Sequence, residues 1–162
     1  MSADAGYRAG PGDFDFLIGR WDVHNRRLLA PLSGSGEWEE FPATAVCHGT
    51  LFAGAANLDE ITFTTKGFNG LTLRLYDPRR AEWSLHWSTS LTGRLSPPIV
   101  GRFDAGRRGE FHGEEIHEGA AVPCRFVWSQ ITGETAHWEQ AFSPDGGGTW
   151  ETNWTMSLTR TG

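Results

Sequence analysis

Residues 137–160 read "HWEQAFSPDGGGTWETNWTMSLTR", and this stretch decides the fold. In its second half Trp154, Met156 and Leu158 alternate with polar residues, which is the period of a β-strand with one buried face. Asp145 and three consecutive glycines lie between the halves. Glycine adopts positive φ at no steric cost, and an Asp side chain can bond amides of its own turn. The stretch therefore predicts an antiparallel hairpin, with strands at 135–142 and 149–160.

The rest of the chain repeats this pattern of short, aromatic-rich runs separated by Gly, Pro, Asp and Asn. Further strands are predicted at 20–29, 37–48, 57–64, 70–76, 82–90, 99–104, 109–117 and 123–131. One helical turn is predicted at 12–18, with Asp13 as its cap. About ten strands without crossover helices indicate antiparallel pairing. Such a sheet loses its edges by closing, so we expect an all-β, up-and-down barrel, with a two-sheet sandwich as the alternative.

The length and composition favour one cytoplasmic domain. The 162 residues are expected to form a flexible segment at 1–12 and a single barrel domain at 13–162. The formal net charge is -6 and no basic stripe is present, so nucleic acid is not an expected partner. No apolar leader and no apolar stretch long enough to span a membrane occurs, so a membrane is not an expected partner. Cys47 and Cys124 form no CxxC pair and are expected to be reduced and buried.

The turn itself, "SPDGGGTW" (143–150), has the Ser-x-Asp-x-Gly-x-Thr-Trp spacing of the Asp-box found in sialidases and other β-propellers. A propeller would carry one copy per blade, whereas this chain has a single copy and no repeat. The motif therefore predicts a structural hairpin tip that Trp150 anchors, rather than a glycan site.

A second motif lies at the start of the barrel, in "FDFLIGRWDV" (14–23), where Gly-x-Trp follows a short apolar turn. This resembles the lipocalin and calycin superfamily, in which the tryptophan closes one end and a late arginine packs across it. Trp21 and Arg160 would have these roles. "ANLDE" (56–60), "LTLRLYDP" (71–78), "EWSLHWS" (82–88), "RFVWSQIT" (125–132) and the final hairpin are similar to an uncharacterised bacterial family of lipocalin-like proteins. The resemblance implies a calycin-type barrel and no particular activity.

Alternation divides each strand into two faces, and we expect the more apolar face to line the lumen. This expectation places inside Trp83, Leu85 and Trp87; Leu71, Leu73 and Leu75; and Trp154, Met156, Leu158 and Arg160.

The last hairpin has two plausible registers. Pairing Ser143 with Trp150 sets Ala141 opposite Thr152 and brings His137 and Glu139 into the lumen. A slip of one residue brings Trp138, Gln140 and Phe142 inside instead. The sequence leaves both registers open.

Several polar residues lie within the aromatic strands and are candidates for a site, because a buried charge must be paired or face a ligand. They are Asn57, Asp59, Glu60, Arg74, Arg125, Glu139, Gln140 and Asn153. The arginines could form ion pairs with Asp59 and Glu139 across the wall, or receive an acidic ligand that stacks on tryptophan. The predicted ligand-binding residues are Arg74, Trp83, Trp87, Arg125, Gln140, Asn153 and Trp154.

Enzymatic and metal chemistry have weaker support. His137 and Glu139, two apart on one strand, are the candidate catalytic acid and base if they face the lumen. In "EFHGEEIHE" (110–118), His112 and His117 point to opposite faces, which does not make a zinc site. The sequence thus predicts no metal and no cofactor.

Three functions follow from these observations. The first is a barrel that binds a small apolar or aromatic molecule in its lumen. The second is a cofactor-free isomerase, cyclase or lyase that uses His137 or Glu139. The third is a structural or interaction protein, for which an exposed apolar patch and a homodimer would be evidence.

Overall fold

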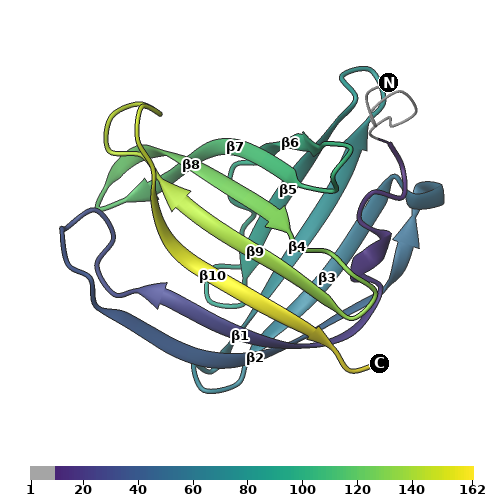
Figure 1. Cartoon of the computed structure of the whole chain (residues 1–162), viewed down its shortest axis with the longest axis horizontal. Coiled ribbons are helices and arrows are strands. Elements are labelled where there is room, and N and C mark those ends of the chain that lie inside the picture. Colours follow the sequence, from purple (N-terminus) through teal and green to yellow (C-terminus); the bar gives the residue numbers. More distant parts are fainter. Residues whose placement is uncertain (1–9) are drawn as a thin grey trace.

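The computed structural model describes residues 10–162, which form one closed barrel of ten antiparallel strands (Figure 1). Each strand pairs with the next along the chain, and the last pairs with the first. The predicted all-β, up-and-down barrel is confirmed, and the two-sheet sandwich is not formed. The strands are β1 (Gly19–Leu28), β2 (Trp38–Leu51), β3 (Ala56–Phe63), β4 (Phe68–Asp77), β5 (Glu82–Thr89), β6 (Ile99–Phe103), β7 (Gly109–His117), β8 (Ala120–Ser129), β9 (Thr135–Phe142) and β10 (Glu151–Arg160).

Two short 3-10 turns accompany the strands, η1 (Asp15–Leu17) and η2 (Phe52–Gly54). Asp13 does not cap η1 as predicted, because the residue at the cap position is Phe14, which makes no side-chain cap bond. The Asp13 carboxylate instead accepts hydrogen bonds from the backbone N–H of Gly10 and from Trp83 Nε1. Residues 1–9 of the expected flexible segment lie outside the described residues, and Gly12 N–H bonds to Gly54 O at 3.0 Å.

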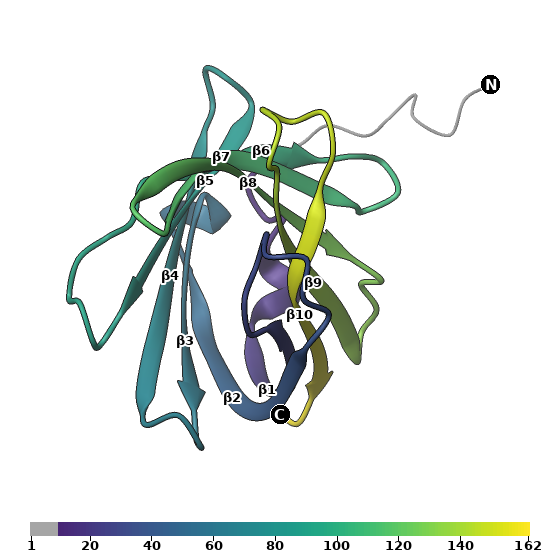
Figure 2. The same ribbon diagram turned by 90° about the vertical axis from the view of Figure 1, so that its left-hand side faces the viewer.

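The turn η1 lies at one end of the barrel (Figures 1 and 2), where Phe14, Leu17 and Trp21 belong to the buried core cluster. Trp21 Nε1 donates to Leu17 O at 2.9 Å, and the Arg160 guanidinium lies 4.3 Å above the centre of the indole. Arg160 also donates to the carbonyl oxygens of Phe16 and Ile18. The Gly-x-Trp motif has a steric reason, since a Cβ at Gly19 would lie 2.5 Å from Arg160 Nη1. The roles expected of Trp21 and Arg160 are therefore confirmed.

The predicted faces are right for β5 and β10 and wrong for β4. Leu85, Trp87, Trp154, Met156 and Leu158 all border the interior. On β4, Arg74 and Thr72 point inward, and Leu71, Leu73 and Leu75 lie on the opposite, outer face. Alternation divides a strand into two faces, but here the inner face carries an arginine, because Asp59 on β3 pairs with it.

The last hairpin contains a β-bulge that reconciles the two predicted registers. Next to the turn, Ala141 pairs with Thr152, as the first register requires. The register then shifts between Thr152 and Trp154, so that Trp154 pairs with Gln140 and Met156 with Trp138. Beyond the bulge the second register holds, and Trp138 and Gln140 face the interior. A bulge leaves one residue unpaired and locally changes which way side chains point. Asn153 and Trp154, although adjacent, both border the interior.

The Asp-box loop is a structural hairpin tip, as predicted. Asp145 accepts hydrogen bonds from the Thr149 side chain and backbone at 2.7 Å and from the Ser143 hydroxyl at 2.8 Å. These bonds stabilise the carboxylate and lower its pKa to about 2. Trp150 anchors the loop on the outer wall of the barrel, where its ring lies 4.8 Å from the Arg125 guanidinium.

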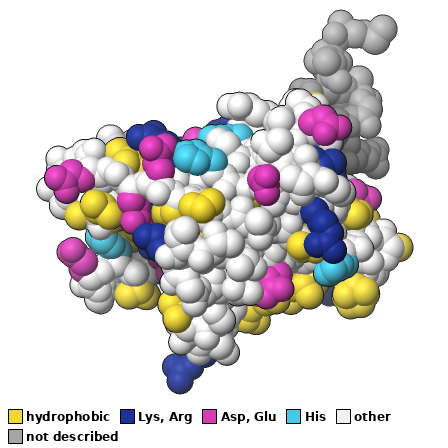
Figure 3. Space-filling model, turned by 90° about the horizontal axis from the view of Figure 1, so that it is seen from below, with side chains coloured by type: hydrophobic (Ala, Val, Ile, Leu, Met, Phe, Trp, Pro, Cys, Tyr) yellow, Lys and Arg dark blue, Asp and Glu magenta, His cyan; other side chains and the backbone are white. Residues whose placement is uncertain are grey.

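The outer surface is mixed in character. On the face shown in Figure 3, acidic, basic and hydrophobic side chains are interspersed. Within residues 10–162, no helix has the length and apolar character needed to cross a membrane.

Candidate functional site

The interior of the barrel holds a cavity of about 670 Å³ above the closed end. Aromatic residues from opposite walls line it, and aliphatic residues fill the spaces between them. The aromatic lining residues are Trp21, Trp87, Phe126, Trp128, Trp138, Phe142 and Trp154. The lumen is therefore not packed solid, and a small molecule could occupy it.

Five of the seven predicted ligand-binding residues lie on the cavity wall: Arg74, Trp87, Gln140, Asn153 and Trp154. Trp83 and Arg125 do not. Trp83 is fully buried in the closed end, where its ring meets Phe14 edge-on at 4.9 Å. Arg125 pairs with Ala141 on the outer face of the wall and stacks on Trp150. These two predictions are corrected, because Trp83 packs against the residues that close the end and Arg125 points away from the lumen.

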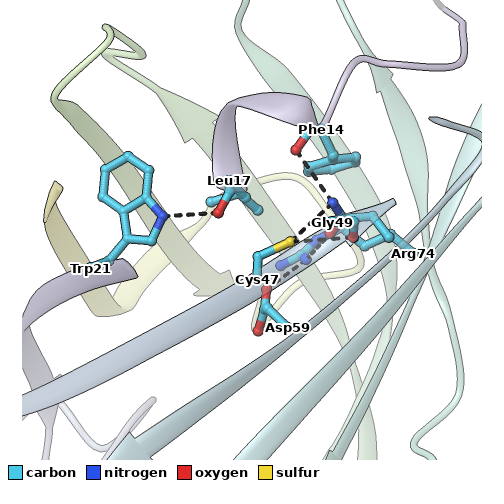
Figure 4. Close-up of polar contacts among 8 residues, drawn as sticks. Phe14, Leu17, Trp21, Cys47, Gly49, Asp59 and Arg74 are labelled. Atoms are coloured by element: carbon cyan, nitrogen blue, oxygen red, sulfur yellow. Dashed lines mark hydrogen bonds and ion pairs between the residues drawn. The ribbon is translucent and has the colours of Figure 1, made fainter. Parts of the chain in front are cut away.

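The strongest electrostatic feature near the floor is the pair of Arg74 and Asp59, from neighbouring strands. Arg74 Nη1 lies 2.6 Å from Asp59 Oδ2 and 2.8 Å from Asn57 Oδ1. Asn57 Nδ2 in turn lies 3.4 Å from Cys47 Sγ. Figure 4 shows Cys47, Asp59 and Arg74 gathered beside the turn that carries Phe14 and Leu17. Arg74 is only 3% exposed, and the Asp59 carboxylate beside it balances its charge.

The opposite wall presents amides among tryptophans. Gln140 Nε2 donates to Asn153 Oδ1 at 2.9 Å, and Trp154 Nε1 donates to Asn25 Oδ1 at 3.0 Å. Asn153 Nδ2 is buried without a hydrogen-bond partner among the described residues. The β10 bulge is the reason that an amide and an indole from adjacent positions lie together in this wall.

His137 and Glu139, the predicted acid and base, lie on the outer face of β9. Their inward neighbours Trp138 and Gln140 border the cavity, whereas neither His137 nor Glu139 does. His137 Nε2 and Glu139 Oε2 are 3.8 Å apart, and both side chains are partly exposed. The structure therefore brings the two residues together, but outside the cavity in which an acid–base role was predicted.

Two ionisable residues on β7 also point into the barrel, Glu115 and His117. The sequence did not lead us to predict either as a site residue. Both line the mouth of the cavity. Burial raises the pKa of the Glu115 carboxyl. His117 Nε2 donates to Pro31 O at 3.0 Å, because a carbonyl oxygen can only accept. The signal was present, since strict alternation from the fully buried Phe111 places Gly113, Glu115 and His117 on the same face.

The segment between β1 and β2 bends toward the mouth of the cavity. Leu29 and Pro31 border the cavity from this segment. Its attachments are the His117–Pro31 bond and a hydrogen bond of 2.8 Å from Leu32 N to the Glu151 carboxylate. The mouth is thus bordered by residues that lie far apart in the sequence.

Across residues 10–162, no three His, Cys, Asp or Glu side chains converge in a way that could hold a metal ion. Cys47 and Cys124 are buried and unpaired with each other, as expected from the sequence. Burial raises the pKa of the Cys124 thiol to about 12, so this group is a neutral thiol at physiological pH.

Comparison with known proteins adds no family to this description. No protein-family model matches the chain, and no curated protein resembles it closely enough in sequence to count as a relative.

Proposed function

We propose that the protein binds a small, mostly apolar or aromatic molecule in the lumen of its barrel. The observation that carries this proposal is the cavity of about 670 Å³. Ligand sites in proteins usually measure about 300–1,000 Å³ and combine apolar walls with a few placed polar groups. This lumen has both features.

The chemistry of the walls supports the proposal. Trp87, Trp138 and Trp154 border the cavity, and indole rings bind flat apolar molecules through large contact areas. Removing apolar surface from water is favourable by about 25 cal/mol per Å². Covering the apolar wall of the cavity therefore contributes a favourable free energy to the binding of a ligand.

We further propose that the chain belongs with the lipocalin-like barrels and acts in the cytoplasm. The closed ten-stranded barrel and the Trp21–Arg160 pair support the first statement. The two buried cysteines, which form no disulfide, support the second, since reduced thiols persist in that compartment.

The proposal is tested with the neutral apolar fluorophore N-phenyl-1-naphthylamine, titrated into the purified protein. We expect saturable, one-to-one binding with enhanced probe emission, because the probe leaves water for the lumen. The Ala45→Phe variant adds a ring to the cavity wall, and it should weaken binding at least tenfold.

The matched control is Ala121→Phe, which adds the same ring at an exposed position of β8. It should bind the probe with an affinity within twofold of the native protein. Far-UV circular dichroism establishes that each variant is folded. If Ala45→Phe does not fold, Met156→Trp narrows the same cavity from β10. Equal binding by the native protein and a folded cavity-filled variant would place the probe elsewhere and overturn the proposal.

A further inference from the structure

The charged residues that line the cavity differ in how they are neutralised. Arg74 is paired with Asp59 at 2.6 Å, and Glu39 is paired with Lys66 at 2.7 Å. Arg27, at the exposed rim, lies 4.6 Å from the centre of the Trp154 ring in a cation–π contact. Arg74 and Glu39 are thus each balanced by an opposite charge, whereas Arg27 is exposed to solvent and stacks on an aromatic face.

Glu115 is the exception. Its side chain lines the cavity and is half-buried, but no Lys, Arg or His nitrogen of residues 10–162 lies within 4 Å of its carboxylate. The charged form therefore lacks a compensating group, and the raised pKa of this carboxyl reflects burial. A partly desolvated carboxylate without a counter-charge is costly, and such perturbed groups are common at sites that meet a ligand.

The surroundings of Glu115 favour a cation over an anion as that partner. Phe126, Trp138, Phe142 and Trp154 line the same cavity, and the faces of aromatic rings attract cations. An anion would meet the carboxylates of Glu115 and Asp59. The charge of Arg74 is already balanced by Asp59, although Arg74 Nε has no hydrogen-bond partner among the described residues. A neutral apolar ligand would cover the Glu115 carboxylate without supplying a counter-charge.

We propose that the lumen ligand carries a basic nitrogen, and that Glu115 is the carboxylate that binds it. This inference rests on the proposed function, because it assigns a chemical class to the molecule in the same cavity. The ligand is then an amine with an apolar or aromatic body. Its ammonium group forms a charge-assisted hydrogen bond with Glu115, and its body lies against the tryptophans.

The test is isothermal titration of three molecules of nearly the same size: 1-naphthylmethylamine, 1-naphthylmethanol and 1-naphthoate. At neutral pH they carry a positive charge, no charge and a negative charge on the same ring system. We expect the amine to bind at least tenfold more tightly than the alcohol, and the carboxylate to bind most weakly. In Glu115→Gln the amine and the alcohol should bind within threefold of each other, with the affinity for the alcohol unchanged.

Glu114→Gln is the matched control, because Glu114 is the adjacent residue of β7 and is exposed on the outer face. It removes the same charge from the same strand and should preserve the preference for the amine. Equal binding of amine and alcohol by the native protein, or a preference that survives Glu115→Gln, overturns the inference and leaves the proposed function standing. If none of the three molecules, nor N-phenyl-1-naphthylamine, binds, both proposals fail.

Discussion

The two ends of the barrel use the same residue types for different purposes. At the closed end, Arg160 lies over Trp21 at 4.3 Å, and at the mouth Arg27 lies over Trp154 at 4.6 Å. Both indoles border the cavity, but Trp21 is also bonded to Leu17 of η1, whereas Trp154 is bonded to Asn25 in the barrel wall. The comparison teaches that an Arg–Trp contact does not by itself indicate a site. The group to which the indole is bonded decides whether it holds a turn at the floor or belongs to the wall.

The largest effect should come from removing a tryptophan at the closed end. Trp21→Ala is expected to lower the free energy of unfolding by about 4 kcal/mol, because it leaves a large void under η1 and frees Leu17 O of its bond. Trp87→Ala, at the cavity wall, should cost only about 1–2 kcal/mol, since Trp87 is already less completely packed. Urea denaturation of both variants measures the difference. Equal losses would show that the two ends are packed alike and would break the comparison.

The next effect concerns the ion pair at the floor. Asp59→Asn leaves the Arg74 guanidinium buried without its counter-charge and is expected to cost about 3 kcal/mol. The double variant Asp59→Leu, Arg74→Met should cost less than Asp59→Asn, because it removes both charges. Urea denaturation of each variant gives the values. A double variant that is no more stable than Asp59→Asn would argue that the pair is not the reason for the inward Arg74.

A smaller effect is expected at Gly70, over which the Trp87 ring lies. A Cβ added at this position would overlap the indole, so Gly70→Ala must displace Trp87. We expect a loss of about 1–2 kcal/mol in stability, typical of overpacking, and a change of severalfold in the affinity for N-phenyl-1-naphthylamine.

Gly133→Ala is the control for this change, because a Cβ at Gly133 meets no atom within 4 Å. Unchanged affinity in a folded Gly70→Ala variant would show that the position of Trp87 does not shape the site.

The smallest effect concerns Glu115 and depends on pH. Its pKa is raised in the folded protein. As the pH rises above the ordinary pKa of glutamate, the unfolded chain loses this proton before the folded protein does. The free energy of unfolding therefore falls as the pH rises. Glu115→Gln removes that contribution. The variant should match the native protein near pH 4 and exceed it by a few degrees in Tm near pH 8.

Thermal unfolding of the two proteins across this pH range checks the prediction, with Glu114→Gln as the exposed control. A difference between Glu115→Gln and native protein that stays constant with pH would show that the carboxyl is adequately solvated in the cavity. The charge at the mouth would then resemble an ordinary surface charge.

Much of the fold could be predicted because its signals are local. The runs of alternating residues and the turns between them placed all ten strands within a few residues, and "SPDGGGTW" was correctly read as a hairpin tip. Trp21 and Arg160 were paired through resemblance to a family, and their contact is present. These features depend on near neighbours along the chain or on a motif that needs no register.

The candidate site could be predicted only in part, because it depends on which face of a strand points inward. Trp87, Gln140, Asn153 and Trp154 were placed correctly on the cavity wall. Glu115 was not predicted although its strand alternates cleanly, because this strand carries ionisable residues on both of its faces. His137 and Glu139 were placed in the lumen in one of two registers, and the bulge at Asn153 selects the other beyond Thr152.

The sequence by itself determined the strands and the turns, since alternation and turn chemistry act over a few residues. It favoured closure into a barrel, because an open sheet of this kind would expose its edges. Only the tertiary structure decided the direction of the faces. A bulge of one residue exchanges inside and outside for the rest of a strand, and a buried pair such as Asp59 and Arg74 turns a leucine face outward. Both depend on partners from other strands, and so does the isolation of Glu115 in the cavity.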